Sequence, residues 1–183
     1  MSLVTNKQPF EYLREVDERI SSRHRDLREQ DAHMQLHLHF CLKQHDLLLP
    51  IREGSEVVNE IEYTPAPASK SWMVGYANLR GDLLVLLDLQ GFLFGQEDKQ
   101  IKLKGKKIVV SRFDGLCMGI LVDRVVGLKR VWDTDLSQNC PSNWDDSVVE
   151  FLAKVYQEEG SFFGEIDVKK IADSERFSRM RVY

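Results

Sequence analysis

The stretch from Gly75 to Leu89 constrains the fold more than any other part of the chain. It contains two apolar segments separated by a turn signal at Gly81-Asp82, where glycine can adopt the positive φ that a short hairpin needs. The second segment, Leu83 to Leu87, is an unbroken apolar run of strand length, which is typical of a strand buried on both faces. Asn78 and Arg80 interrupt this apolar setting with polar side chains that need partners.

Short strand patterns recur along the rest of the chain. Apolar and polar residues alternate from Leu36 to Lys43, and further short apolar runs lie at 47–51, 107–111, 116–122 and 162–166. Many short strands with few long helices are typical of an all-β barrel or sandwich. A short helix is predicted at 167–172, with Asp167 as its cap.

An amphipathic helix is predicted ahead of the strands, from Pro9 to about Arg28. Its apolar residues recur at helical spacing: Phe10, Leu13, Val16, Ile20 and Leu27. Such an apolar stripe must be buried against another surface. We favour packing against the β domain of the same chain over packing against a partner protein or a second copy of the chain. We therefore expect a helical N-terminal extension over residues 1–35 and a β domain over residues 36–178.

Composition narrows the class of partner and the place of action. The net charge of −4 provides no basic field, which argues against nucleic acid as a partner. The three cysteines follow no metal spacing, so reduced thiols in a cytoplasmic protein are the simplest interpretation. No signal peptide is visible, and no apolar run is long enough to span a bilayer. We expect no direct membrane insertion, so that any membrane association would depend on another protein.

Catalytic and metal sites find little support in the sequence. It has no Gly-rich phosphate loop, no G-x-S-x-G and no kinase ATP motif. Asp88 and Asp123 could form an acid pair, but each follows an apolar strand, where capping or turn bonding is the usual role. Zinc could be bound by a group of nearby side chains, namely His33, His37, His39 and Cys41. One strand face can hardly supply a closed tetrahedron, so we expect no metal, no cofactor and no catalytic residue.

A set of motifs, found in order, resembles the CheW family, the adaptors of bacterial chemosensory arrays. The N-L-R-G sequence at 78–81, followed by an apolar strand and Asp88-Leu89, is similar to the signature of that family. The segment 56–58 is similar to the family's QEI segment, and 118–125 to its GIVVDxV strand. The resemblance covers roughly 37–177, with one departure at Val85, where the family often has proline.

This resemblance implies a fold and a function. It implies a pair of small five-stranded β-barrels, spanning approximately 36–95 and 105–178. It also implies a non-catalytic adaptor that couples the cytoplasmic tip of a methyl-accepting chemoreceptor to a CheA-type histidine kinase, recruited to receptor arrays by these partners. The N-terminal extension and Trp72 are most similar to the PilI type, which serves type IV pili and twitching motility. A flagellar CheW adaptor is the alternative, and a small nucleic-acid-binding β-barrel is a more distant one.

The resemblance also implies two interaction surfaces. The receptor-facing residues would be Asn78, Arg80, Val85 and Val125. The kinase-facing residues would be Glu56, Val57 and Gly75. We further expect Arg80 to be buried or half-buried and to pair with Glu56 across the groove between the barrels, since an unpaired buried arginine costs several kcal/mol.

Overall fold

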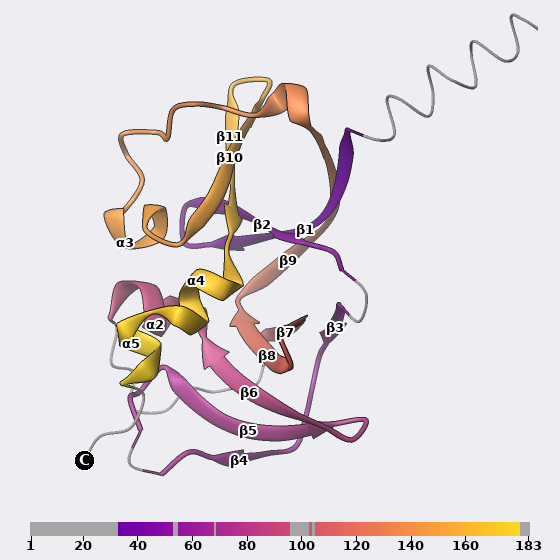
Figure 1. Ribbon diagram of the computed structural model, residues 1–183, viewed down its shortest axis with the longest axis vertical. Helices are drawn as coiled ribbons and strands as arrows, with labels where there is room; N and C mark the ends of the chain where they lie inside the picture. The colour runs from indigo at the N-terminus through magenta and orange to yellow at the C-terminus, as the bar shows by residue number, and fades with distance from the viewer. Residues whose placement is uncertain (1–32, 53–54, 68, 96–102, 104, 180–183) are drawn as a thin grey trace, which may run out of the picture. The chain divides into compact units, whose positions relative to one another are not determined.

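The computed structural model describes residues 33–52, 55–67, 69–95, 103 and 105–179 (Figure 1). The chain divides into two units, Met1–Met34 and Gln35–Tyr183. Nearly all described residues belong to the second unit. The helix predicted at 9–28 lies outside the described residues.

The first β-sheet of the second unit has five strands. Its order is β10-β11-β2-β1-β9, with bounds β1 (Met34–Leu42), β2 (His45–Pro50), β9 (Arg124–Trp132), β10 (Leu152–Glu158) and β11 (Ser161–Ile166). β1 and β2 form an antiparallel hairpin, as do β10 and β11, while β11 and β2 run parallel. The sheet therefore joins strands from the two ends of the domain.

The second β-sheet has six strands in the order β3-β7-β8-β6-β5-β4. Their bounds are β3 (Glu56–Val58), β4 (Tyr63–Pro65), β5 (Met73–Leu79), β6 (Asp82–Asp88), β7 (Lys107–Phe113) and β8 (Leu116–Val122). Only β6 and β8 pair in parallel, and the other neighbours are antiparallel. In Figure 1 the long strands β5 and β6 lie side by side in this sheet.

The all-β class is confirmed, but the strands do not divide between the sheets as the two ranges 36–95 and 105–178 predict. β1 and β2 belong to the first range, yet they pair with β9, β10 and β11 from the second. Conversely, β7 and β8 complete the sheet formed by β3 to β6. Local apolar periodicity identifies a strand but not its hydrogen-bonding partner, so the sequence pattern could not reveal this exchange.

The helices in the described part of the chain are short. They are α2 (Leu89–Phe94), the 3-10 helix η1 (Asp133–Asp135), α3 (Asp146–Val149), α4 (Val168–Asp173) and α5 (Glu175–Ser178). The helix predicted at 167–172 is confirmed as α4. Its predicted cap is also confirmed, because the Asp167 side chain accepts hydrogen bonds from the backbone amides of Lys169 and Lys170. None of these described helices has the length and apolar character to cross a membrane.

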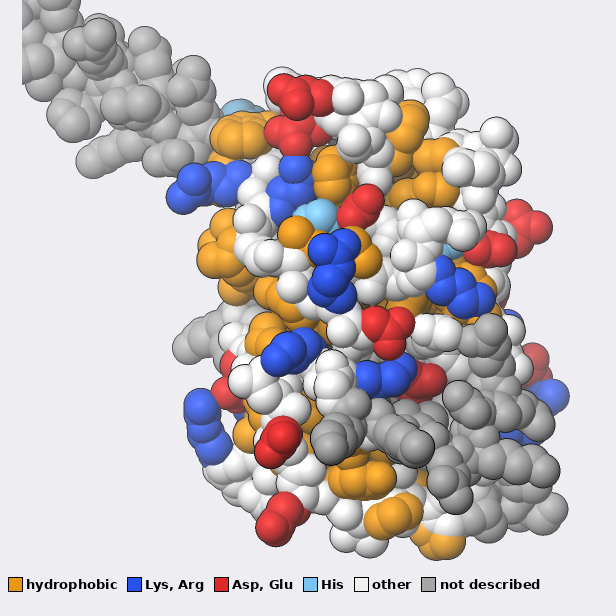
Figure 2. Space-filling model, turned by 180° about the vertical axis from the view of Figure 1, so that it is seen from behind, with side chains coloured by type: hydrophobic (Ala, Val, Ile, Leu, Met, Phe, Trp, Pro, Cys, Tyr) orange, Lys and Arg blue, Asp and Glu red, His pale blue; other side chains and the backbone are white. Residues whose placement is uncertain are grey.

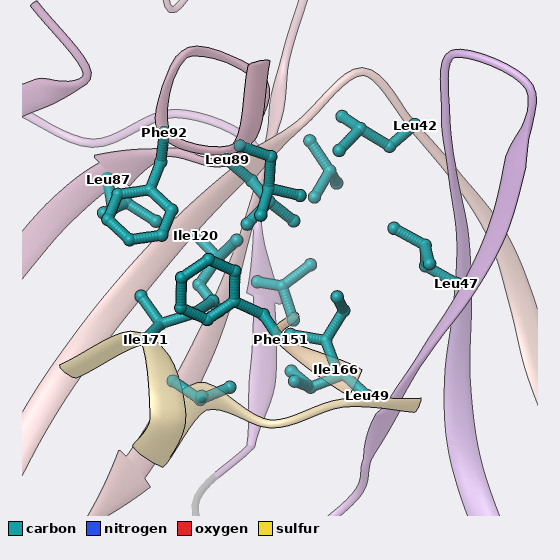
Figure 3. Packing of buried hydrophobic residues seen from close by; sticks show 14 of the residues in the cluster. Leu42, Leu47, Leu49, Leu87, Leu89, Phe92, Ile120, Phe151, Ile166 and Ile171 are labelled. Carbon is teal, nitrogen blue, oxygen red and sulfur yellow. The ribbon is translucent and has the colours of Figure 1, made fainter. Parts of the chain in front are cut away.

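The two faces of β6 pack into different hydrophobic clusters. Leu84 and Leu86 belong to a cluster within the second sheet. Val85 and Leu87 belong to a larger cluster that also contains residues of the first sheet and of the helices. Figure 3 shows this larger cluster, in which Leu47 and Leu49 of β2 pack with residues of β6, β8, α2 and α4. The prediction that Leu83 to Leu87 is buried on both faces is confirmed for its last four residues, which are at most 9% exposed.

Candidate protein-interaction site

The β5–β6 hairpin closes with a two-residue turn. Leu79 pairs with Asp82, so Arg80 and Gly81 form the loop, with φ values of 55° and 97°. Positive φ at both positions is the requirement of the type I′ hairpin turn. The Asn78 side chain accepts a hydrogen bond from the Gly81 amide at 3.0 Å. The predicted turn is therefore present, one residue earlier than Gly81-Asp82, and Asn78 stabilises it.

A network of four charged side chains lies beside this turn. We call Glu56, Arg80, Asp82 and Arg112 the hairpin-end network. Arg80 Nη2 is 3.0 Å from Glu56 Oε2, and Arg112 Nη2 is 3.5 Å from Glu56 Oε1. Arg112 also donates from Nε to Asp82 Oδ2 at 3.2 Å. The network thus connects β3, β7 and the start of β6.

The predicted Arg80–Glu56 pair is present, but the predicted burial of Arg80 is wrong. The predicted location is also wrong, because the pair joins β3 to the β5–β6 turn of the same sheet and does not cross a groove between two barrels. The Arg80 side chain is 78% exposed, against 22% for Glu56. An exposed ion pair contributes at most about 1 kcal/mol to stability, because water and salt screen it. The Arg80 guanidinium is therefore held at the surface, where a partner can reach it.

Sequence reasoning missed Arg112, the more enclosed cation of the network, which is 27% exposed. A signal for it existed, because Arg112 follows Ile108 and Val110 on one face of β7 and ends that apolar alternation. Burial disfavours the charged form of Arg112 and by itself would lower its pKa. The attraction of Cys117, Asp82 and Glu56 outweighs this effect, so the pKa of the guanidinium is raised. Burial likewise raises the pKa of the Cys117 thiol, against the influence of Arg112. Arg112 therefore remains a permanent cation in the network.

Exposed apolar side chains accompany the network on the opposite face of the sheet. Val57 pairs with Val109 in β7 and is 42% exposed. Leu83 precedes Leu84 in β6 and is 66% exposed. Because side chains alternate across a strand, Val57 and Leu83 point away from the face that carries Glu56. Leu83 was not among the predicted site residues, although it is the first residue of the apolar run after the turn.

The other three predicted site residues, Val85, Gly75 and Val125, lie neither in the hairpin-end network nor among the exposed apolar side chains beside it. Val85 is only 9% exposed and packs in the larger core. Gly75 is buried where β4 and β5 meet, paired with Pro65. Val125 is half-buried and lies in β9 of the other sheet. Hence the structure brings Glu56, Asn78 and Arg80 together at the hairpin, with Val57 adjacent on β3.

The two candidate acids meet at one lysine. Lys106 Nζ is 2.9 Å from Asp88 Oδ1 and 3.2 Å from Asp123 Oδ1. Asp88 also caps α2 by accepting from the Gly91 amide at 3.0 Å, as its position after a strand predicts. Burial opposes the charge of Lys106, but the two carboxylates outweigh it and raise its pKa. The ion pair between Lys106 and Asp88 therefore connects the end of β6 to the residue that precedes β7.

Comparison with known proteins identifies the family. A sequence profile described as the CheW-like domain matches residues 37–176. The chain belongs to the CheW-like family. Protein PilI of Pseudomonas aeruginosa is 32% identical over 135 residues, covering 73% of this chain and 75% of that protein. Chemotaxis protein CheW of Thermotoga maritima is 27% identical over 136 residues, covering 74% of this chain and 86% of the relative.

A further relative and a solved structure agree with this assignment. Protein FrzA of Myxococcus xanthus is 30% identical over 124 residues, covering 67% of this chain and 75% of FrzA. The crystal structure of the scaffolding protein TtCheW from Thermoanaerobacter tengcongensis matches with a TM-score of 0.62 at 20% identity, covering 78% of this chain and 90% of that one. At this identity the match concerns the fold alone. The CheW-like resemblance inferred from the N-L-R-G motif is confirmed.

Proposed function

We propose that this CheW-like chain is a non-catalytic adaptor that couples chemoreceptors to a CheA-type histidine kinase. The observation that carries the proposal is the match of a CheW-like domain to residues 37–176, which includes the whole hairpin-end network. The similarity to PilI and FrzA supports a chemosensory system for surface motility, with type IV pili and twitching as the output. The similarity to CheW of Thermotoga maritima supports a flagellar pathway as the alternative.

The mechanism needs binding and no covalent chemistry. Arg80, its turn partner Asn78 and the exposed Leu83 form the receptor-facing contact. The kinase-facing contact is the edge strand β3, which presents Glu56 on one face of the sheet and Val57 on the other. The ion pair between Arg80 and Glu56 lies where these two contacts meet. A receptor that engages Arg80 changes the charge environment of Glu56, which is one physical way for the two binding equilibria to be coupled.

The buried members of the predicted surfaces have supporting roles. Val85 fills the core beneath the hairpin, and Gly75 allows β4 to approach β5. Both therefore keep the surface strands in place without touching a partner. Val125, half-buried in β9, would add a receptor contact from the other sheet.

Surface charge supports protein partners over nucleic acid. On the face shown in Figure 2, acidic and basic side chains are interspersed among apolar ones, without a broad basic patch. Nucleic-acid-binding surfaces need clustered lysine and arginine to neutralise phosphates. The net charge of −4 and the mixture of charged and apolar side chains suit a protein–protein interface. We place this chain at the cytoplasmic tips of receptors, where its partners would hold it.

The Arg80→Ala variant is expected to weaken binding to the cytoplasmic tip of a chemoreceptor about tenfold or more, since arginine is one of the residues enriched at the hot spots of protein interfaces. Its unfolding free energy should change by no more than about 1 kcal/mol, because the Arg80–Glu56 pair is exposed. Calorimetric titration with a receptor-tip fragment from the same organism measures the first effect. Urea unfolding measures the second.

Arg179→Ala is the matched control, because Arg179 is also an exposed arginine in an exposed ion pair, with Glu175. It should leave receptor binding unchanged. Equal affinities of the Arg80→Ala variant and the parent chain would contradict the receptor-facing role of Arg80. A large loss of stability in Arg80→Ala would instead show that the pair is structural.

A further inference from the structure

The β1–β2 hairpin brings together three side chains that commonly bind metals. Its strands are joined by Lys43 and Gln44, so that Leu42 pairs with His45 and Cys41 with Asp46. His39 lies on the same face of β1 as Cys41, two residues away, and diagonal to Asp46. Directly opposite and diagonal positions of a hairpin are within reach of each other's side chains. The register itself therefore clusters His39, Cys41 and Asp46.

The donor atoms of these residues are already close. His39 Nε2 is 2.7 Å from Asp46 Oδ1, and the Cys41 thiol donates to the same oxygen at 3.2 Å. One donor atom from each residue lies within 4.8 Å of the others. All three residues are half-buried, so a bound ion would keep one side open to water.

We propose that His39, Cys41 and Asp46 form a zinc site on this hairpin. Imidazole, thiolate and carboxylate are the three ligand types that Zn²⁺ uses in proteins. Three protein ligands leave the fourth tetrahedral position for water. Mg²⁺ and Ca²⁺ prefer oxygen ligands, so the mixture of nitrogen and sulfur selects a transition metal.

The surroundings both oppose and assist a metal. Arg124 of β9 donates from Nη2 to Cys41 Sγ at 3.0 Å, and its charge repels a cation. This contact is at the exposed side of the cluster, where water and salt weaken the repulsion. A guanidinium N–H can also remain hydrogen-bonded to a coordinated sulfur, as outer partners of metal ligands do. The ring of Phe163 contacts His39 edge-on at 5.4 Å between centroids and helps to orient the imidazole.

This inference departs from the expectation of no metal, which considered ligands from one strand only. Asp46 comes from β2 and supplies the third ligand that the strand β1 lacks. His37, considered in the same group, is not part of the cluster. Its Nε2 is 3.0 Å from the buried carboxylate of Glu165 instead.

Cobalt and zinc titrations of the full chain, stripped of metal by a chelator and kept reduced, test the site. The expected result is one Co²⁺ per chain with a sulfur-to-cobalt charge-transfer absorption, displaced by Zn²⁺. Cys41→Ser should abolish that absorption and weaken zinc binding about tenfold or more. His39→Gln and Asp46→Asn should each weaken zinc binding by a similar factor while retaining the thiolate signal.

Cys140→Ser is the matched control, because Cys140 is another half-buried free thiol and belongs to no such ligand cluster among the residues that the structure describes. It should bind both metals like the parent chain. Absence of the charge-transfer absorption in the parent chain would overturn the proposal. An absorption that survives Cys41→Ser, or that disappears in Cys140→Ser, would also overturn it. If none of the three ligand variants reduces the affinity for zinc, the metal binds only adventitiously at the surface, and the proposal is wrong.

Discussion

Gly75→Ala is expected to reduce the unfolding free energy by about 3 kcal/mol, the upper end of overpacking penalties. A Cβ atom at this position would lie 2.2 Å from the carbonyl oxygen of Thr64 and 2.9 Å from its carbon. These are backbone atoms of β4, which cannot rotate away as a flexible side chain does. The added methyl group must therefore push β4 from β5, where Gly75 pairs with Pro65. Urea unfolding of the variant and the parent chain measures the loss.

Gly81→Ala is the comparison variant for this prediction. A Cβ atom on Gly81 would meet no atom within 4 Å, so only its φ of +97° opposes the substitution. That backbone strain costs about 1–2 kcal/mol. If Gly75→Ala costs no more than Gly81→Ala, the close approach of Thr64 does not constrain position 75. If Gly75→Ala loses kinase binding but keeps the stability of the parent chain, Gly75 contacts the kinase directly, as the family resemblance first implied.

Glu165→Ala is expected to cost about 3 kcal/mol, because it leaves buried polar partners without their shared acceptor. Glu165 is 7% exposed. Its Oε2 accepts from the Tyr156 hydroxyl at 2.9 Å and is 3.0 Å from His37 Nε2. Both partners are almost completely buried, so water cannot replace the carboxylate. Glu158→Ala, which removes a partly exposed carboxylate paired with Lys129, should cost no more than about 1 kcal/mol.

The pH dependence of the Glu165→Ala deficit provides a second readout. Burial opposes ionisation of Glu165, but the bonds from His37 and Tyr156 outweigh it and lower the pKa of this carboxyl group. A lowered pKa stabilises the fold above the unfolded-state value of about 4.3, and this contribution is lost as pH falls through the lower folded-state pKa. The ionic stabilisation should thus persist at pH 5 and decrease only in stronger acid. A deficit that disappears between pH 7 and pH 5 would mean that the pKa is raised.

Strand identity could be predicted from the sequence because it depends on local patterns. Alternation from Leu36 to Lys43 and the apolar run after Gly81 are visible without any tertiary information, and both segments are strands. The cap at Asp167 was equally local. Which strands share a sheet depends on contacts between residues far apart in the chain, such as Gly164 with Leu47. Those contacts leave no periodic signal.

The candidate interaction site was predictable in part for the same reason. The N-L-R-G motif locates the turn and Arg80, and the family resemblance supplies Glu56 as its partner. Exposure is a tertiary property, so the burial of Val85 and the exposure of Arg80 could not be read from neighbouring residues. Arg112 and Asp46 were missed because each acts through a residue on an adjacent strand, Glu56 and Cys41 respectively.

Co-sedimentation is the most direct test of the adaptor function. Receptor-containing membrane vesicles are mixed with the CheA-type kinase of the same organism, with and without this chain, and the kinase in the pellet is measured. We expect the kinase to sediment with the receptor when the parent chain or Arg179→Ala is added, and much less with Arg80→Ala. Kinase recovery that is the same with and without the chain would show that it does not couple the kinase to the receptor.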